Sequence, residues 1–283
     1  MSQPSREQRK QMGAKAFGQF ASVYDRIGPR FFAHFGRRLV ELAQLEPGAR
    51  VLDVATGPGI VAFPAAERVG EGGYVLGIDL APGMIDAAIH ERDERGVRNV
   101  DFRVMDAEDL DLPDGSFDAL LCGFGLMLFD EPRPCAEFFR VLKPGGTVAL
   151  STWGRDDERW AWMGELLKRF SPFQPSPPPA DQPAPLTTRT VEGMTAKLSR
   201  AGFTDDVRVF SEDYEIFYAD ADEWAAGSIP ARALFQFVSP ADHDEIVAIA
   251  ADHMEAMRTA DGVPQRLNAL YTLGRKPIQE MTE

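Results

Sequence analysis

The chain is poor in cysteine and has no excess of positive charge, and both shortages narrow what it can be. Only Cys122 and Cys135 occur among the 283 residues. Two thiols inside apolar or helical stretches form neither a disulfide scaffold nor a CxxC zinc site. Lys and Arg number 30 against 44 Asp and Glu, so the formal net charge is −14. Because this charge repels a phosphate backbone, we expect no nucleic-acid partner.

Long hydrophobic runs are also missing. No stretch approaches the ~18 apolar residues of a membrane helix. Residues 1–20 are polar with scattered charges, whereas a secretion signal needs an apolar core of about 7–15 residues. We therefore expect a cytoplasmic protein without a membrane span. Histidine is scarce as well, with four residues in the chain, and we predict no metal site.

Between residues 50 and 153 the chain alternates short β-rich runs with helical patterns. The runs predict strands at 50–54, 74–79, 100–105, 117–122 and 146–152. Helical stretches separate them, and a Lys-Pro-Gly-Gly turn at 143–146 ends the last of these stretches. The helices are predicted at 60–69, 82–94 and 132–141. This alternation is typical of βαβ units, so we predict an α/β fold with a mostly parallel sheet and helices on both faces.

The segments on either side of this core predict a cover and a cap. Residues 1–45 are an aromatic-rich, helical cover, residues 46–153 form the ligand-binding core, and residues 154–283 complete the sheet. A helical cap is inserted in this last part at about 220–262. The other elements expected there are a helix at 158–170, a proline-rich surface loop at 171–185, a helix at 191–201, and strands at 207–218 and 267–273.

The first predicted strand leads into a glycine-rich loop, Gly57-Pro58-Gly59, that opens a helix. Glycines let a ligand approach the backbone, and the N–H groups at a helix start are free to bind it. Asp53, Asp79 and Asp106 stand at the ends of three consecutive strands. Since the carboxyl ends of parallel strands share one edge of an open sheet, we expect these carboxylates around a single ligand crevice.

The strand-end carboxylates and the glycine-rich loop also fit two alternatives. An Asp at a strand end, before a glycine turn, can simply cap a helix. Residues 57–62 also match the G-x-G-x-x-[GA] pattern of NAD-binding domains, with the acidic Asp79 about 20 residues further on. An NAD(P)-dependent oxidoreductase is therefore the alternative function from another reaction class.

Five motifs in order give the chain a specific resemblance. They are VLDVATGPG at 51–59, GIDLAPGM at 77–84, DAEDL at 106–110, PDGSFD at 113–118 and LKPGG at 142–146. Together they resemble the class I S-adenosylmethionine-dependent methyltransferases, and within these the branch that contains the ubiquinone and menaquinone C-methyltransferases. The resemblance covers about residues 17–153. It implies a Rossmann-like fold with a seven-stranded sheet whose last strand is antiparallel.

The resemblance also implies the cofactor, S-adenosylmethionine, and the residues that bind it. Asp53 and the glycines of the loop would line its methionine end, Asp79 would hold the ribose hydroxyls, and Asp106 would contact the adenine. Tyr24 resembles the Tyr of a Tyr-Asp pair that closes over the cofactor. The full set is Tyr24, Asp53, Ala55, Thr56, Gly57, Gly59, Asp79, Leu80, Met84, Asp106, Ala107, Cys122, Gly123 and Phe124.

Methyl transfer is an in-line displacement that depends mainly on holding the nucleophile and the methyl group about 3–3.5 Å apart. A phenol or carbon nucleophile also needs a base that takes its proton. The candidates are Tyr24, His34, His243 and His253, and the sequence singles out none of them.

Aromatic side chains in the cover and the C-terminal part predict an apolar acceptor pocket. They are Phe17, Phe20, Tyr24, Phe31, Trp160, Trp162, Trp224, Phe235 and Phe237. The expected function is methyl transfer to carbon or oxygen of a small, largely apolar molecule of aromatic, polyketide or isoprenoid type. A protein that binds S-adenosylmethionine without transferring its methyl group is a further alternative. We expect a monomer or a homodimer.

Overall fold

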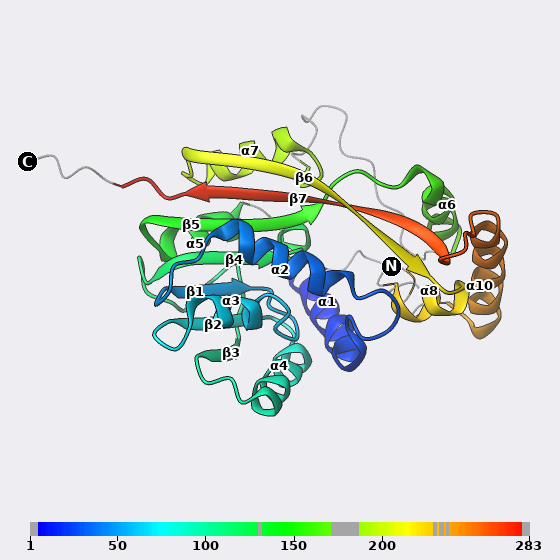
Figure 1. Cartoon of the computed structure of the whole chain (residues 1–283), viewed down its shortest axis with the longest axis horizontal. Helices are drawn as coiled ribbons and strands as arrows, with labels where there is room; N and C mark the ends of the chain where they lie inside the picture. The colour runs from blue at the N-terminus through cyan, green and yellow to red at the C-terminus, as the bar shows by residue number, and fades with distance from the viewer. Residues whose placement is uncertain are drawn as a thin grey trace, which may run out of the picture.

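A seven-stranded sheet forms the centre of the molecule (Figure 1). The computed structural model describes residues 5–129, 132–170, 187–228, 231, 235 and 238–278. The strand order is β3-β2-β1-β4-β5-β7-β6. Strands β1 to β5 pair in parallel, and β7 runs antiparallel to both β5 and β6, which confirms the expected sheet. The strands are β1 (Arg50–Val54), β2 (Tyr74–Asp79), β3 (Val100–Val104), β4 (Phe117–Gly123), β5 (Leu142–Trp153), β6 (Asp205–Tyr218) and β7 (Val263–Arg275).

Helices cover both faces of the sheet, as predicted for a Rossmann-like fold. Side chains alternate between the faces along each strand. On β1, Val51 packs into one hydrophobic layer while Leu52 and Val54 pack into the other. The first layer holds α2 (Phe31–Ala43), α3 (Ala62–Val69) and part of α4 (Pro82–Arg95); the second holds α5 (Arg133–Val141) and α7 (Val191–Arg200).

The chain begins with a helix that lies against the edge of this core. Helix α1 (Arg6–Phe20) starts at a capping box between Ser5 and Gln8, and the short 3₁₀ helix η1 (Ala21–Val23) follows it. None of the α1 side chains is fully buried. The helix rests on α4 at a glycine contact, where a Cβ added to Gly83 would lie 2.8 Å from the carbonyl oxygen of Gly18. Backbone therefore meets backbone at this contact.

A helical group lies at the end of the sheet toward which β5 and β6 run (Figure 1). It consists of η3 (Glu158–Trp160), α6 (Ala161–Phe170), α8 (Ala221–Gly227) and α10 (Pro240–Glu255). Trp160, Trp224 and Ile246 are buried together in a hydrophobic cluster of this group. The group touches the N-terminal segment where Glu223 packs beside Gly28. The surface loop expected at 171–185 lies outside the described residues.

Several element boundaries differ from those predicted, and three of the differences have a clear structural reason. Strand β5 starts at Leu142, so the expected turn at 143–146 lies inside a bulged part of the strand, between the pairs Phe117↔Leu142 and Ala119↔Thr147. Helix α3 begins at Ala62 because the loop before it is still left-handed at Gly59. Strand β7 begins at Val263, earlier than expected, because it pairs with β6 from Tyr218 onward.

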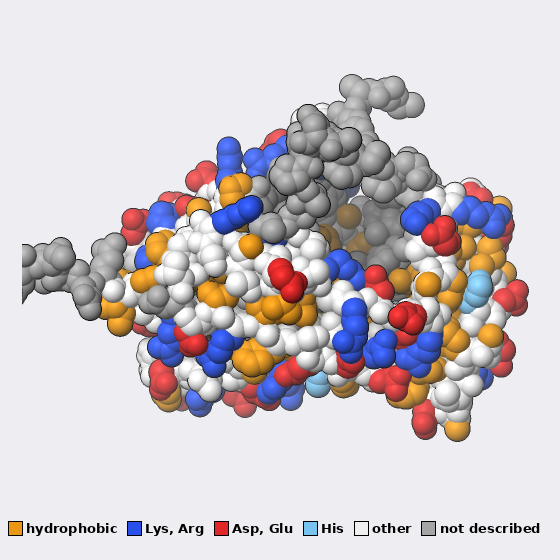
Figure 2. Space-filling model, turned by 90° about the horizontal axis from the view of Figure 1, so that it is seen from above, with side chains coloured by type: hydrophobic (Ala, Val, Ile, Leu, Met, Phe, Trp, Pro, Cys, Tyr) orange, Lys and Arg blue, Asp and Glu red, His pale blue; other side chains and the backbone are white. Residues whose placement is uncertain are grey.

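Charged side chains of both signs lie next to one another on the face shown in Figure 2. On β6, Asp213 pairs with Arg155 and Glu215 with Arg159.

Within the part of the chain that the structure describes, no helix combines the length and the apolar character needed to cross a membrane.

We expect Gly83→Ala to loosen α1 selectively. The added methyl group would press on the Gly18 backbone at 2.8 Å, and such overpacking typically costs about 1–3 kcal/mol. Hydrogen exchange should therefore speed up in α1 while the sheet keeps its protection. Gly164→Ala in α6 is the control, since a Cβ there meets nothing within 4 Å. Unchanged exchange in α1 would contradict this role of the glycine contact.

Candidate functional site

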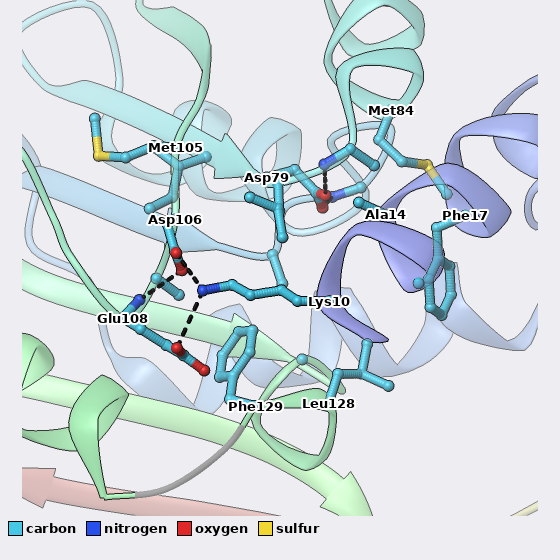
Figure 3. Close-up of a pocket in the computed structure, with 18 of the residues that line it drawn as sticks. Lys10, Ala14, Phe17, Asp79, Met84, Met105, Asp106, Glu108, Leu128 and Phe129 are labelled. Atoms are coloured by element: carbon cyan, nitrogen blue, oxygen red, sulfur yellow. Dashed lines mark hydrogen bonds and ion pairs between the residues drawn. The ribbon is translucent and has the colours of Figure 1, made fainter. Parts of the chain in front are cut away.

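A cavity of about 460 Å³ lies between the carboxyl ends of the parallel strands and helix α1. Its floor comes from the ends of β1, β2, β3 and β4, and its roof from α1 and Tyr24. On the remaining side, Leu128 and Phe129 of the segment after β4 close the wall (Figure 3). The location is the crevice where open α/β sheets bind their ligands.

The loop after β1 brings backbone to the cavity wall. Ala55, Gly57 and Gly59 all have left-handed φ values, of 55°, 54° and 88°. At Gly59 a Cβ would lie 2.5 Å from the Phe63 ring, so only glycine fits. Ala55 adopts the same conformation despite its side chain, which is the kind of local strain found at binding sites.

Asp79 ties this loop to the end of β2. Its carboxylate accepts hydrogen bonds from the Gly57 N–H at 3.0 Å and from the Ala81 N–H at 2.9 Å. Burial raises the pKa of Asp79, and these backbone N–H groups oppose the rise. The carboxylate is thus fixed at the cavity wall between two strand ends.

Asp53 lies beneath the cavity wall and is fully buried. It accepts a hydrogen bond of 2.6 Å from the Thr56 hydroxyl. Burial raises the pKa of Asp53 to about 7, the neighbouring Asp79 carboxylate adds to the rise, and the hydrogen bond from Thr56 opposes it. The Asp53 carboxyl group therefore gains or loses its proton near neutral pH, because its buried surroundings disfavour the charged form.

A cluster of four charged side chains joins α1 to the end of β3, and Figure 3 shows three of them, Lys10, Asp106 and Glu108. Lys10 reaches down from α1 between Asp106 and Glu108, with its Nζ 3.0 Å from the Glu108 carboxylate. Arg6 also pairs with Glu108. Burial lowers the pKa of Lys10, but its hydrogen bonds to the two carboxylates outweigh this effect and raise it. The roof is thus held over the cavity by opposite charges.

Phe124 stands at the end of β4 in a left-handed conformation, with φ of 56°. Its ring stacks on Trp153 with a centroid distance of 4.1 Å, and it also meets Phe32 and Phe35 of α2 edge-on. This packing holds the strained backbone in place. Tyr24 continues the aromatic wall, since it stacks on Phe32 at 5.1 Å.

Of the predicted base candidates, Tyr24 lines the cavity and the three histidines do not. His34 stacks on Tyr214 at 3.8 Å, His253 on Trp162 at 4.9 Å, and His243 lies against Phe235. The aromatic residues predicted to form one acceptor pocket lie at different places. Phe17 and Tyr24 line the cavity, Phe20 and Phe31 line a smaller one beside it, and Phe235 lines a shallow cavity near His243. The C-terminal helical group contains Trp160, Trp162 and Trp224, and Phe237 lies outside the described residues.

Most of the predicted binding residues meet at the cavity. Those that line it are Tyr24, Ala55, Gly57, Asp79, Leu80, Met84, Asp106, Ala107, Gly123 and Phe124. The other four, Asp53, Thr56, Gly59 and Cys122, lie behind the wall, where they shape the loop and the end of β4. The lining residues that sequence analysis missed are Arg6, Arg9, Lys10, Gly13, Ala14, Ile78, Ala81, Met105, Glu108, Gly125, Leu128 and Phe129. Positions 6, 10, 13, 14 and 17 share one face of α1, but charged and small residues among them give no hydrophobic periodicity, so the sequence carried no signal for this face.

Comparison with known proteins gives this site its family. Residues 51–146 match the family model described as a methyltransferase domain. Residues 51–146 are therefore a methyltransferase domain, and the comparisons support its relation to the class I S-adenosylmethionine-dependent methyltransferases. This match agrees with the resemblance to methyltransferases that the five sequence motifs carry. The comparisons do not support the alternative of a nicotinamide-dependent enzyme.

The chain is similar to two curated methyltransferases. The chain is 43% identical over 144 residues to the aklanonic acid methyltransferase DauC of Streptomyces sp. (strain C5), and this alignment covers 50% of this chain and 66% of that protein. It is 41% identical over 140 residues to the demethylmenaquinone methyltransferase of Thermus thermophilus, and this alignment covers 45% of this chain and 63% of that protein. The relation to the quinone branch is thereby confirmed. The alignments span about two thirds or less of the relatives' length.

A solved structure extends the likeness of fold over nearly the whole chain. The crystal structure of the [4+2]-cyclase SpnF superposes with a TM-score of 0.58 at 22% identity, and the match covers 98% of this chain and 99% of that one. The fold of the methyltransferase domain, with its cover and its C-terminal part, is therefore one that occurs in known proteins.

We expect Asp53→Asn to change how stability depends on pH. The folded chain holds the proton of Asp53 up to about pH 7, whereas the unfolded chain releases it near 3.8. The raised pKa favours the folded state at low pH, and this contribution is lost as the pH rises through 7. The free energy of unfolding should fall between about pH 4 and 7 in the wild type, by roughly 2–4 kcal/mol more than in the variant.

Urea unfolding at several pH values measures this difference. Asp101→Asn, which removes an exposed carboxyl group from β3, is the matched control and should leave the slope of the wild type unchanged. Parallel pH profiles of the wild type and Asp53→Asn would show that Asp53 titrates normally.

Proposed function

We propose that the chain transfers the methyl group of S-adenosylmethionine to carbon or oxygen of a small, largely apolar molecule. The observation that supports this most is the composition of one cavity, where carboxylates at the ends of β2 and β3 face an apolar wall. Asp79 and Asp106 supply the polar side, and Phe17, Leu128 and Phe129 are among the apolar lining residues. A few fixed polar groups in an otherwise apolar cavity are typical of small-molecule sites.

The residues present fit this cofactor. A cavity of about 460 Å³ lies within the range of small-ligand pockets, about 300–1,000 Å³. Asp79 is fixed by two backbone N–H groups and would accept hydrogen bonds from the ribose hydroxyls. Asp106, Ala107 and Met84 would hold the adenine, and the loop at Ala55–Gly57 would hold the methionine end. Asp53, Thr56, Gly59 and Cys122 would position these groups from behind.

S-adenosylmethionine supplies a methyl group on a positively charged sulfur. The protein's task is then alignment, because the acceptor must meet this methyl group in line at about 3–3.5 Å. Phe124 and Gly123 line the cavity at the end of β4, and we assign to them the wall beside the reacting groups. Tyr24 is the one predicted base candidate that lines this cavity. Burial and the nearby Asp25 and Asp79 carboxylates raise its pKa, so it would act as a neutral hydroxyl that donates a hydrogen bond.

The acceptor would lie between α1 and the segment after β4. Gly13 and Ala14 leave room on the helix, while Leu128, with 58% of its surface exposed, offers an apolar contact opposite. The curated relatives that act on aklanonic acid and demethylmenaquinone support an acceptor of polyketide or quinone type. Within the chain, residues 1–45 would then serve as cover, 46–153 as the cofactor-binding core, and 154–283 as the part that completes the sheet and carries the cap.

We expect Asp79→Ala to weaken binding of S-adenosylhomocysteine. Two hydrogen bonds to a charged acceptor are lost, each typically worth about 1.5–3 kcal/mol, so the dissociation constant should rise at least tenfold. Titration calorimetry on folded protein measures it. Asp101→Ala, on the neighbouring strand β3 but outside the cavity, is the matched control. An unchanged dissociation constant in Asp79→Ala would remove this residue from the site, and displacement by NAD would contradict the cofactor assignment.

The activity itself is tested by product analysis. The protein is incubated with S-adenosylmethionine and either aklanonic acid or a demethylated quinol, and we expect a product heavier by one CH₂ group together with S-adenosylhomocysteine. Asp79→Ala serves as the low-activity control. Tight binding of S-adenosylmethionine with no product from aromatic, polyketide or quinol acceptors would instead support a protein that only binds the cofactor.

A further inference from the structure

A second cavity, of about 400 Å³, lies on the outer side of the glycine-rich loop. Four arginines line it from three parts of the chain: Arg26 and Arg30 before α2, Arg37 on α2, and Arg95 at the end of α4. Residues 58–60 of the loop and the ring of Phe63 complete its walls. We refer to this cavity as the arginine cleft.

The carboxylates of the arginine cleft do not balance its arginines. Glu91 is shared, since it pairs with Arg26 at 2.8 Å and with Arg95 at 2.7 Å. Asp25 is the other carboxylate that lines the cleft. It accepts hydrogen bonds from the backbone N–H groups of Phe32 and Ala33 in the first turn of helix α2. Four positive charges therefore face two negative ones.

Two of the guanidinium groups are available to a ligand. Arg30 and Arg37 are both exposed, and no carboxylate in the described part of the chain forms an ion pair with either. Arg30 acts on Asp25 only through space, where its charge lowers the pKa of that carboxyl group against the larger effect of burial. An excess of positive charge at one concave place stands out in a chain whose net charge is −14.

The guanidinium group suits one class of ligand in particular. Its planar fork of N–H donors matches phosphate and carboxylate oxygens two at a time. A carboxylate carries a single charge, whereas a phosphate monoester carries about 1.5 to 2 negative charges and three acceptor oxygens. The two excess positive charges around the arginine cleft match the charge of a phosphate monoester better than that of a carboxylate. Arg95 is already fixed in position, since its guanidinium lies over the Phe63 ring at 4.6 Å.

We propose that the arginine cleft binds the phosphate group of a small molecule at a site separate from the cofactor cavity. The residues of the glycine loop stand between the two cavities, and Tyr24 lines both. Phosphate in the cleft would connect the segment before α2 to α4, next to Tyr24. Phosphate and cofactor should therefore bind at the same time. This site does not depend on the proposed function, because no methyl transfer is needed to occupy it.

Titration calorimetry at constant ionic strength tests this site with two probes, inorganic phosphate and phenyl phosphate, with acetate as the control for charge alone. We expect saturable binding of at least one phosphate and none of acetate. Tighter binding of phenyl phosphate would identify an organic phosphate ester as the ligand, and tighter binding of inorganic phosphate would identify the free ion. If neither inorganic phosphate nor phenyl phosphate shows saturable binding, the proposal is overturned.

Arg37→Ala should weaken phosphate binding roughly tenfold, and Arg37→Lys, which keeps the charge but loses the fork, should weaken it less. The matched control is Arg92→Ala, which removes the same charge from α4 at a residue that pairs with Asp93 and Asp101 outside the cleft. Its effect should stay within about twofold, as expected for a change in net charge. Equal losses in Arg37→Ala and Arg92→Ala would overturn the proposal, and so would displacement of phosphate by S-adenosylhomocysteine. Circular dichroism of each variant confirms that it is folded.

Discussion

Strand β1 pairs with β2 along one edge and with β4 along the other. The chain leaves β1 toward one face of the sheet and leaves β4 toward the opposite face. Helix α3 follows β1 on one face, and α5 follows β4 on the other. Because the two connections diverge, the carboxyl ends of β1 and β4 are left uncovered, and a crevice opens between them. The positions of Asp79, Asp106 and Phe124 at the cavity all follow from this one feature of the topology.

Close backbone contacts then shape the crevice. Gly125, just after β4, has no room for a side chain because a Cβ would lie 2.5 Å from the Ala55 methyl group. Ala55 and Phe124 both take left-handed conformations, and the packing of the aromatic wall offsets this cost at Phe124. The site therefore depends on small residues at the strand ends as much as on its charged ones. The same dependence holds at α1, where Gly18 and Gly83 let the roof approach α4.

Sequence patterns predicted the floor of the site but not its roof. Asp79 and Asp106 were predictable because each lies at the end of a clear strand, and strand ends of a parallel sheet share one edge. Lys10 was not, since the sequence does not say that its partners, Asp106 and Glu108, lie 96 and 98 residues away in the chain. The aromatic residues could be counted in the sequence, but their places in the fold could not be predicted from it. Counting them could not tell the cavity wall at Tyr24 from the hydrophobic cluster at Trp224, because both uses bury the same kind of side chain.

Helix α1 covers the cavity at the strand ends without fully burying any of its own side chains. It is held by ion pairs to Asp106 and Glu108, by one glycine contact, and by the packing of a few apolar side chains on Ala81 and Met84, all of which can break while the seven strands stay paired. Elements held in this way open locally at a small fraction of the free energy of global unfolding. Helix α1 can therefore move away from the cavity while the sheet beneath it stays folded. The ion pairs weaken as salt is added, so access to the cavity from this side should depend on the ionic strength around the protein.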